Sequence, residues 1–184
     1  MWFGELIKLD KDFYQQDAKT VAKALIGKRL ITNIGSKKIS RIVETEAYLG
    51  PHDLACHSAK GLTTRTKVMF GPAAKTYVYL IYGIHTMFNI VTGNSDGQAV
   101  LIRAVEPVSL IKANTNGPGK LTKALGIGLE HNDISLLNNT IYLEDAKPVN
   151  KIITTSRIGI DYAKEWKDAP LRFYDFDSKF VSKR

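Results

Sequence analysis

The sequence of 184 residues contains a single cysteine, Cys56, and no apolar run of the length that crosses a membrane. One cysteine cannot form a disulfide within the chain or build a zinc cluster of several cysteines. The opening residues, MWFGELIKLDKDFY, lack the basic start, the apolar run and the small-residue cleavage site of a secretion signal. We therefore expect a cytoplasmic protein that has no membrane partner.

Acidic residues are scarce relative to basic ones: 18 Asp and Glu stand against 26 Lys and Arg, and the formal net charge is +8. The basic residues are spread through the chain and form no long tail, which indicates a basic surface on a folded protein. Such a surface suits a polyanion, and nucleic acid is the first candidate. A protein that is basic without binding nucleic acid is the alternative, because net charge alone does not separate the two.

The chain also lacks internal repeats, low-complexity tracts and clear linkers, so residues 1–184 are predicted to form one domain. A helix is predicted over residues 17–26, between a capping Asp17 and Gly27, and a short helix is predicted after Pro51. Strands are predicted over residues 28–34, 38–48, 77–82, 98–105, 151–160 and 171–180. Clustered strands with few short helices favour an α+β fold, in which a curved, mostly antiparallel β-sheet is flanked by short helices.

Residues 41–48, RIVETEAY, combine two acids and an aromatic ring in a predicted strand. Side chains alternate along a strand, so the residues predicted to share one face are Ile42, Glu44, Glu46 and Tyr48. Buried carboxylates need partners or a chemical task, because burying an unpaired charge is costly. The pattern indicates a site that holds a flat apolar substrate beside a general base. The alternative is a solvated strand face with a surface tyrosine.

A second aromatic cluster is YVYLIY, residues 77–82. In a regular strand Tyr77, Tyr79 and Ile81 share one face, so Tyr79 and Tyr82 cannot both point into one pocket. We expect one of these tyrosines to line a pocket and the other, at the strand end, to project as a wedge. The alternative is an ordinary sheet core, in which aromatic strands are common.

Four potential metal ligands lie close together in the sequence: His52, Asp53, Cys56 and His57. Their spacing matches no common zinc pattern, and the other two histidines, at positions 85 and 131, are far away in the sequence. We therefore predict no metal site and no cofactor.

Several segments recur together in an order that resembles one protein family. They are RIVETEAYLGPHDLACHS, YVYLIYGIHTMFNI, SDGQAVLIRAVEP, GPGKL, RIGI and PLRFY, which extend from about Arg41 to Phe173. This ordered set resembles the 3-methyladenine (alkyladenine) DNA glycosylase family of base-excision repair. The resemblance implies a monofunctional enzyme of a compact bacterial type that acts as a monomer at the nucleoid. Its partner would be double-stranded DNA containing damaged purines, alkylated or deaminated, and its product an abasic site.

The resemblance also implies roles on the reaction side of the site. Glu46 matches the general base that activates a water against the anomeric carbon of a flipped nucleotide. Arg103 matches an arginine near this water and the DNA backbone, and Ile158 matches a position whose carbonyl helps to hold the water. Tyr82 matches the wedge that enters the duplex and fills the vacated space.

Other matched positions belong to the pocket for the flipped base. Tyr48, His57 and Tyr79 match the residues that sandwich the base, and stacking of this kind tolerates many base shapes. Asn89 matches a residue that disfavours the amino group of normal guanine. Backbone groups around Ala55 and His57 match the points that form hydrogen bonds with the edge of the base.

The sequence shows no clear general acid for releasing a neutral purine. Glu44 is conceivable in this role, but an ion pair with an arginine or lysine is the favoured interpretation of this residue. The alternative function is a non-catalytic domain that binds damaged or single-stranded DNA through the same aromatic pocket. Glu46 favours the enzyme over the binding domain, because a carboxylate repels the phosphates of DNA and would weaken the affinity of a protein that only binds. His85 stands where vertebrate members of the family carry a tyrosine.

Overall fold

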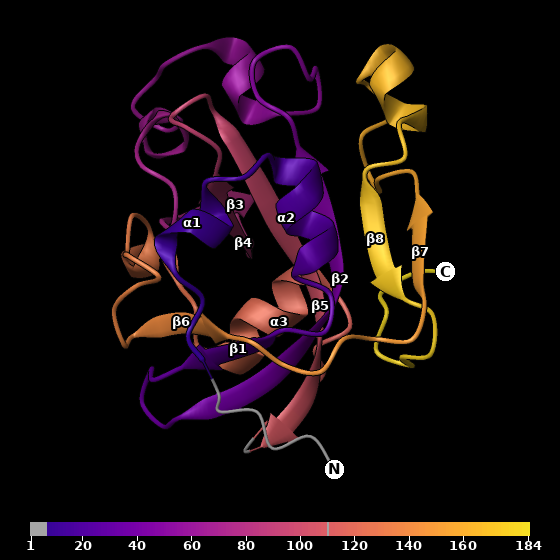
Figure 1. Cartoon of the computed structure of the whole chain (residues 1–184). Coiled ribbons are helices and arrows are strands. Elements are labelled where there is room, and N and C mark those ends of the chain that lie inside the picture. The colour runs from indigo at the N-terminus through magenta and orange to yellow at the C-terminus, as the bar shows by residue number, and fades with distance from the viewer. Residues whose placement is uncertain (1–6, 110) are drawn as a thin grey trace.

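The computed structural model describes residues 7–109 and 111–184; residues 1–6, part of the segment predicted to lack a secretion signal, lie outside the described part. A curled antiparallel sheet organises the fold (Figure 1). Its strands are β1 (Arg29–Thr32), β2 (Lys38–Tyr48), β3 (Thr76–Ile81), β4 (His85–Thr92), β5 (Gln98–Ser109), β6 (Ile141–Glu144), β7 (Ile152–Thr155) and β8 (Arg172–Asp175). The prediction of an α+β fold with a curved antiparallel sheet is confirmed.

Strand β2, which carries RIVETEAY, lies in the middle of this sheet. The strand order is β3-β4-β5-β2-β1-β6, and β8 pairs with both β2 and β7. One edge of β2 pairs with β5, while its other edge pairs first with β1 and then, at Glu44–Glu46, with β8. The acidic part of β2 is therefore enclosed by strands on both edges, which explains why Glu44 and Glu46 are fully buried.

Short helices flank the sheet, as predicted. They are α1 (Lys11–Tyr14), α2 (Ala18–Ala24), α3 (Pro118–Leu125) and the 3-10 helices η1 (His57–Lys60), η2 (Lys67–Phe70), η3 (Leu129–His131) and η4 (Lys164–Asp168). The predicted cap of α2 is confirmed, because the Asp17 carboxylate accepts a hydrogen bond from the Thr20 amide at 3.0 Å. None of the described helices combines the length and apolarity needed to cross a membrane.

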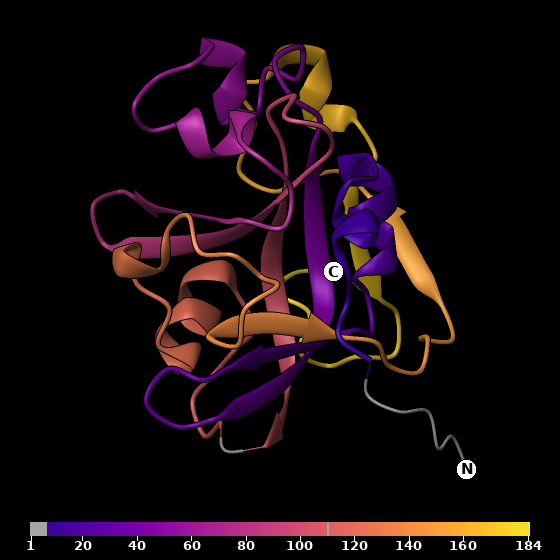
Figure 2. The same cartoon turned by 60° about the vertical axis from the view of Figure 1, so that its left-hand side comes forward.

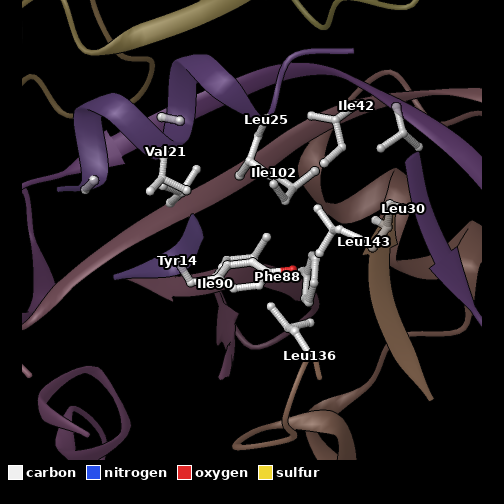
Figure 3. Packing of buried hydrophobic residues seen from close by; sticks show 14 of the residues in the cluster. Tyr14, Val21, Leu25, Leu30, Ile42, Phe88, Ile90, Ile102, Leu136 and Leu143 are labelled. Atoms are coloured by element: carbon white, nitrogen blue, oxygen red, sulfur yellow. The ribbon is translucent and has the colours of Figure 1, made fainter. Parts of the chain in front are cut away.

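The main hydrophobic core lies between α2 and one face of the sheet. Val21 and Leu25 of α2 pack in the same buried cluster as Ile42 of β2 and Ile102 of β5 (Figure 3). The Thr45 hydroxyl also points to this side and donates a hydrogen bond to the Ala22 carbonyl at 2.8 Å. Because neighbouring side chains alternate, Glu44 and Glu46 point to the opposite face.

The ladder between β2 and β5 shifts its register at three places, and two of these bulges lie beside the acids of β2. Ile42 pairs with Val105 and Glu44 with Ala104, so Val43 has no partner in the ladder; Thr45 then pairs with Ile102, so Arg103 has none. The prediction that Ile42 shares a face with Glu44 is therefore wrong, because the extra residue at Val43 breaks the alternation. Glu44, Glu46 and Tyr48 do share a face.

Other differences from the predicted elements have local causes. The segment from Pro51 to Cys56 forms turns, and the predicted helix is present only as the 3-10 helix η1 from His57. The Asp53 side chain accepts hydrogen bonds from the backbone amides of Leu49 and Ala55, which favours the turns. The strands predicted over residues 151–160 and 171–180 are shorter, and strand β4 was not predicted. In Figure 2 the β3–β4 hairpin projects from the left side of the molecule.

Candidate active site

A cavity of about 450 Å³ lies on the face of the sheet opposite α2. The predicted site residues that line it are Tyr48, Ala55, His57, Tyr79, Tyr82, Asn89, Arg103 and Ile158. They come from β2, the turn after it, β3, β4, β5 and the loop after β7, so the fold gathers segments from most of the chain. Of the predicted site residues only Glu46 is not part of the cavity wall, and it contacts three residues that are.

The Glu46 carboxylate lies directly behind this wall. Its Oε2 atom accepts a hydrogen bond from the Tyr48 hydroxyl at 2.9 Å, and its Oε1 atom accepts one from the Ile158 amide at 2.8 Å. Arg103 Nη1 lies 3.2 Å from the same Oε1 atom. The side chain of Glu46 is 0% exposed, so these donors fix its orientation and Arg103 supplies the countercharge that a buried carboxylate needs. The predicted role of Ile158 involves its carbonyl; the contact with Glu46 is made by its amide.

Arg103 bridges the two carboxylates of β2. Its Nε atom donates to Glu44 Oε1 at 3.1 Å, while its Nη1 atom faces Glu46. Burial disfavours the charge of the guanidinium, but the neighbouring Glu46 and Glu44 outweigh this effect and raise the pKa of Arg103. The bulge at Arg103 thus places a permanent positive charge between the two acids.

Glu44 is enclosed by donors. Besides Arg103, it accepts hydrogen bonds from Arg172 Nη1 at 2.9 Å, from the Ser182 amide at 2.6 Å and from the Ser182 hydroxyl at 3.0 Å. Its interpretation as an ion-pair partner is confirmed.

Aromatic rings form the walls of the cavity. The centroids of the His57 and Tyr79 rings are 4.5 Å apart, and Tyr77 lies 5.2 Å from Tyr79. His57 Nδ1 and the Tyr77 hydroxyl form a hydrogen bond of 2.9 Å. Burial, together with nearby Arg65 and Lys60, lowers the pKa of His57 to about 4, so the ring is neutral at neutral pH.

Tyr48 and Asn89 complete the pocket. Tyr48 and Tyr79 pack against the same small apolar cluster, which includes Met69 and Ala99. Burial raises the pKa of the Tyr48 hydroxyl well above its usual range, and the nearby Glu46 carboxylate acts in the same direction. Asn89 is 3% exposed, and its Nδ2 atom donates to the Tyr77 carbonyl at 3.0 Å, which fixes the plane of its amide.

Tyr82 stands at the rim of the cavity, just past the end of β3. Its side chain is 85% exposed, and its backbone has a φ of 53°, which is uncommon for a residue other than glycine. Tyr79 lines the cavity from within β3, while Tyr82 lies past the end of this strand and contributes to the rim of the same cavity. The role of Tyr82 as a wedge stays a prediction.

Sequence reasoning missed one buried ion pair beside the site. The guanidinium of Arg157 binds the Asp53 carboxylate through two contacts, of 2.6 and 2.8 Å, and both side chains are 0% exposed. Asp53, considered above as a potential metal ligand, therefore pairs with an arginine. No group of three or more His, Cys, Asp or Glu side chains within the described ranges is placed to hold a metal ion. If Asp53 is buried, its carboxylate needs a partner of opposite charge, but the sequence does not identify which basic residue is that partner.

Comparisons with known proteins agree with this geometry. A family model described as methylpurine-DNA glycosylase matches residues 12–179. A protein of Legionella pneumophila (strain Lens), provisionally named a 3-methyladenine DNA glycosylase, is 54% identical over 180 residues, which cover 96% of this chain and 98% of the relative. Proteins of Myxococcus xanthus (strain DK1622) and Borrelia garinii subsp. bavariensis with the same provisional name are each 49% identical, over 95% and 96% of this chain and over 93% and 100% of the relatives.

The match to the family model covers most of the chain, and so does each of these relatives. The chain therefore belongs to the methylpurine-DNA glycosylase family, whose members are hydrolases of N-glycosyl bonds in DNA.

Proposed function

We propose that this protein extrudes a damaged purine from double-stranded DNA and hydrolyses its N-glycosidic bond with a water molecule activated by Glu46. The observation that carries the proposal is the fixed, buried carboxylate behind an aromatic cavity. A base stacked in a duplex is out of reach of such a carboxylate, so it must be flipped into the cavity at a cost of a few kcal/mol. Tyr82, exposed at the rim, is suited to fill the space that the base leaves.

The walls suit a cationic base. His57 is neutral at neutral pH, and burial raises the pKa values of the Tyr48 and Tyr79 hydroxyls, so these rings also stay uncharged. Purines alkylated at N3 or N7 carry a positive charge, which neutral aromatic faces attract. Stacking is worth about 1–3 kcal/mol per base and accepts bases of different shape. Asn89, with its amide fixed by Tyr77, is proposed to disfavour the amino group of normal guanine.

The reaction requires one water molecule and no cofactor. The bond between the anomeric carbon and the purine nitrogen breaks, and the base leaves with the bonding electrons. The water oxygen forms a new bond to this carbon, and Glu46 takes the proton that the water loses. The carboxylate also stabilises the positive charge that develops on the sugar. The product is an abasic site, and a single turnover requires no covalent bond to the protein.

Positive charge near the mouth of the cavity suits the phosphates of DNA. The Arg65 guanidinium lies 5.0 Å from the centroid of the Tyr79 ring, and Lys60 belongs to η1 beside His57. Phosphate contacts of this kind make DNA affinity fall steeply with salt concentration. The protein is proposed to bind DNA as a monomer.

The test is base release from duplex oligonucleotides that carry hypoxanthine, 1,N6-ethenoadenine or 7-methylguanine. The native protein, Glu46→Gln and a control, Glu130→Gln, whose side chain is 72% exposed, are compared. We expect release by the native protein and the control, and binding without release by Glu46→Gln. Tight binding without release by the native protein would favour the binding domain instead. The observation that favours a binding domain is that the side chain of Glu46 has no exposed surface.

A further inference from the structure

The buried pair of Asp53 and Arg157 has no role in the reaction described above. Its two short contacts join residues 104 positions apart in the chain, and both side chains are 0% exposed. A buried ion pair adds little net stability, because the loss of hydration offsets the attraction, and an apolar pair of similar size is often as stable. Arg157 Nε, moreover, is buried without a hydrogen-bond partner among the described residues. Stability alone does not account for this pair.

Asp53 holds the turn that follows β2. Its Oδ2 atom accepts a hydrogen bond from the Leu49 amide at 3.1 Å, and its Oδ1 atom accepts one from the Ala55 amide at 3.0 Å. This turn leads into η1, which begins at His57. The Asp53 carboxylate thus fixes the turn that places the backbone of Ala55 and the ring of His57 in the cavity wall.

Arg157 contacts β2, η4 and the Tyr48 ring. It donates to the Ala47 carbonyl of β2 at 2.9 Å and to the Trp166 carbonyl of η4 at 3.5 Å. Its guanidinium carbon lies 4.8 Å from the centroid of the Tyr48 ring. The next residue in the chain is Ile158, whose amide donates to Glu46 at 2.8 Å. Arg157 is therefore in contact with one donor to Glu46 and covalently adjacent to another.

We infer that the Asp53–Arg157 pair positions the Ile158 amide and the Tyr48 hydroxyl on the Glu46 carboxylate, and so sets the direction in which this carboxylate faces the substrate. This inference rests on the proposed function, because it concerns the geometry of the same general base. Asp53 and Arg157 are positioning residues: neither lines the cavity, and they act through Tyr48, Ile158 and Glu46. A displacement of about 1 Å at a catalytic group is enough to slow a reaction about a hundredfold.

The test compares Asp53→Asn with the native protein in single-turnover release of 7-methylguanine and in binding of a duplex that contains a stable abasic-site analogue. Asparagine keeps the shape of the side chain and removes its charge. We expect release about 10–100-fold slower, the range found for residues that orient the ligands of metal sites, with binding largely unchanged. Arg157→Lys, which keeps the charge but loses the double contact, is expected to change the rate in the same direction and serves if Asp53→Asn does not fold.

A double-mutant cycle separates positioning from a general loss of structure. If the pair acts through Glu46, Asp53→Asn slows the native protein but has little further effect on the residual rate of Glu46→Gln. A purely structural defect slows both backgrounds by the same factor. Val21→Ala, in the core on the other side of the sheet, provides a control that lowers the Tm without touching the site.

Three results would overturn the inference. The first is an unchanged rate for Asp53→Asn and Arg157→Lys below their Tm. The second is an equal loss of rate in Val21→Ala at a matched loss of Tm. The third is full additivity with Glu46→Gln. If the native protein releases no base, both the proposed function and this inference are wrong. If the native protein releases the base and the variants release it equally fast, only the inference is wrong.

Discussion

Glu44 and Glu46 lie two positions apart on β2, are both fully buried and share Arg103, yet their surroundings differ. The partners of Glu44 are side chains and an amide of the sheet and of the C-terminal segment, namely Arg103, Arg172 and Ser182. The partners of Glu46 are all residues of the cavity wall. The same residue type is thus structural at one position and directed towards a cavity at the other.

The difference can be expressed in lone pairs. An ionised carboxylate offers about four acceptor sites. Glu44 has four donors: Arg103, Arg172 and the Ser182 hydroxyl on Oε1, and the Ser182 amide on Oε2. Glu46 uses two on Oε1, for Ile158 and Arg103, but Oε2 accepts only the Tyr48 hydroxyl. Glu46 therefore has one donor fewer than Glu44, and its three donors all line the cavity. The water molecule that Glu46 is proposed to activate would supply the fourth contact.

The largest expected effect is that of Glu46→Gln on catalysis. Loss of a general base lowers a rate by about 10²–10⁴-fold, and the amide keeps the shape of the side chain. Single-turnover release of 7-methylguanine measures this loss, and the urea midpoint of unfolding measures stability. Retention of more than about a tenth of the native rate would place the base elsewhere.

Glu44→Gln is expected to show the reverse pattern. Removing the charge leaves Arg172 buried without its carboxylate, and breaking a buried pair costs about 3–5 kcal/mol of the free energy of unfolding. Urea unfolding measures this cost. At temperatures where the variant is folded, release of hypoxanthine and of 7-methylguanine should fall by the same factor. A selective loss for the neutral hypoxanthine would instead make Glu44 a general acid.

The cavity in front of Glu46 includes His57, a histidine that resists protonation. The pKa of His57 is about 4 in the folded protein, below the 6.5 of an unperturbed histidine, so between these values the unfolded chain binds a proton that the native one does not. The free energy of unfolding should therefore fall as the pH drops from 6.5 towards 4, on the order of 1–3 kcal/mol in total. His57→Gln removes this contribution. Identical pH profiles of unfolding for both proteins would contradict the expectation.

Tyr48→Phe removes the hydroxyl from Glu46 Oε2 and leaves the ring in place. A hydrogen bond to a charged group contributes about 1.5–3 kcal/mol, so release should slow by about tenfold or more. Binding of a duplex with an abasic-site analogue serves as the control for the ring. If Tyr48→Phe and Tyr48→Ala release 7-methylguanine equally slowly, the ring and not the hydroxyl is what matters.

Ser182→Ala is expected to have the smallest effect. The substitution removes the hydroxyl that contacts Glu44 at 3.0 Å and Arg103 at 3.4 Å, but the backbone amide of residue 182 still binds Glu44. Loss of one such hydrogen bond costs about 1 kcal/mol of stability. The release rate should stay near that of the native protein. A loss as large as that of Tyr48→Phe would mean that the Glu44 side orients Arg103 for catalysis.

Local patterns in the sequence predicted much of this arrangement. Alternation along residues 77–81 correctly placed Tyr77, Tyr79 and Ile81 on one face, which lines the cavity. The pairing of Glu44 with a basic residue followed from the cost of a buried charge. The bulge at Val43 could not be predicted, because Ile42 continues the alternating pattern and only the ladder with β5 reveals the extra residue. The contact between Asp53 and Arg157 spans 104 positions, and no local rule selects one arginine among the many basic residues.

The two bulges have a consequence for the topology of the site. Each adds one residue to one strand, so their shifts cancel, and the pairing of Ile42 with Val105 and of Thr45 with Ile102 would form a regular ladder if Val43 and Arg103 were both absent. The sheet would therefore keep its alignment if both residues were absent, but not if only one of them were. Deletion of both Val43 and Arg103 would remove the charge between the two acids and leave the rest of the β2–β5 register unchanged. Deletion of one of them alone would shift the register by one residue, so that the side chains of a whole strand segment would point to the opposite face.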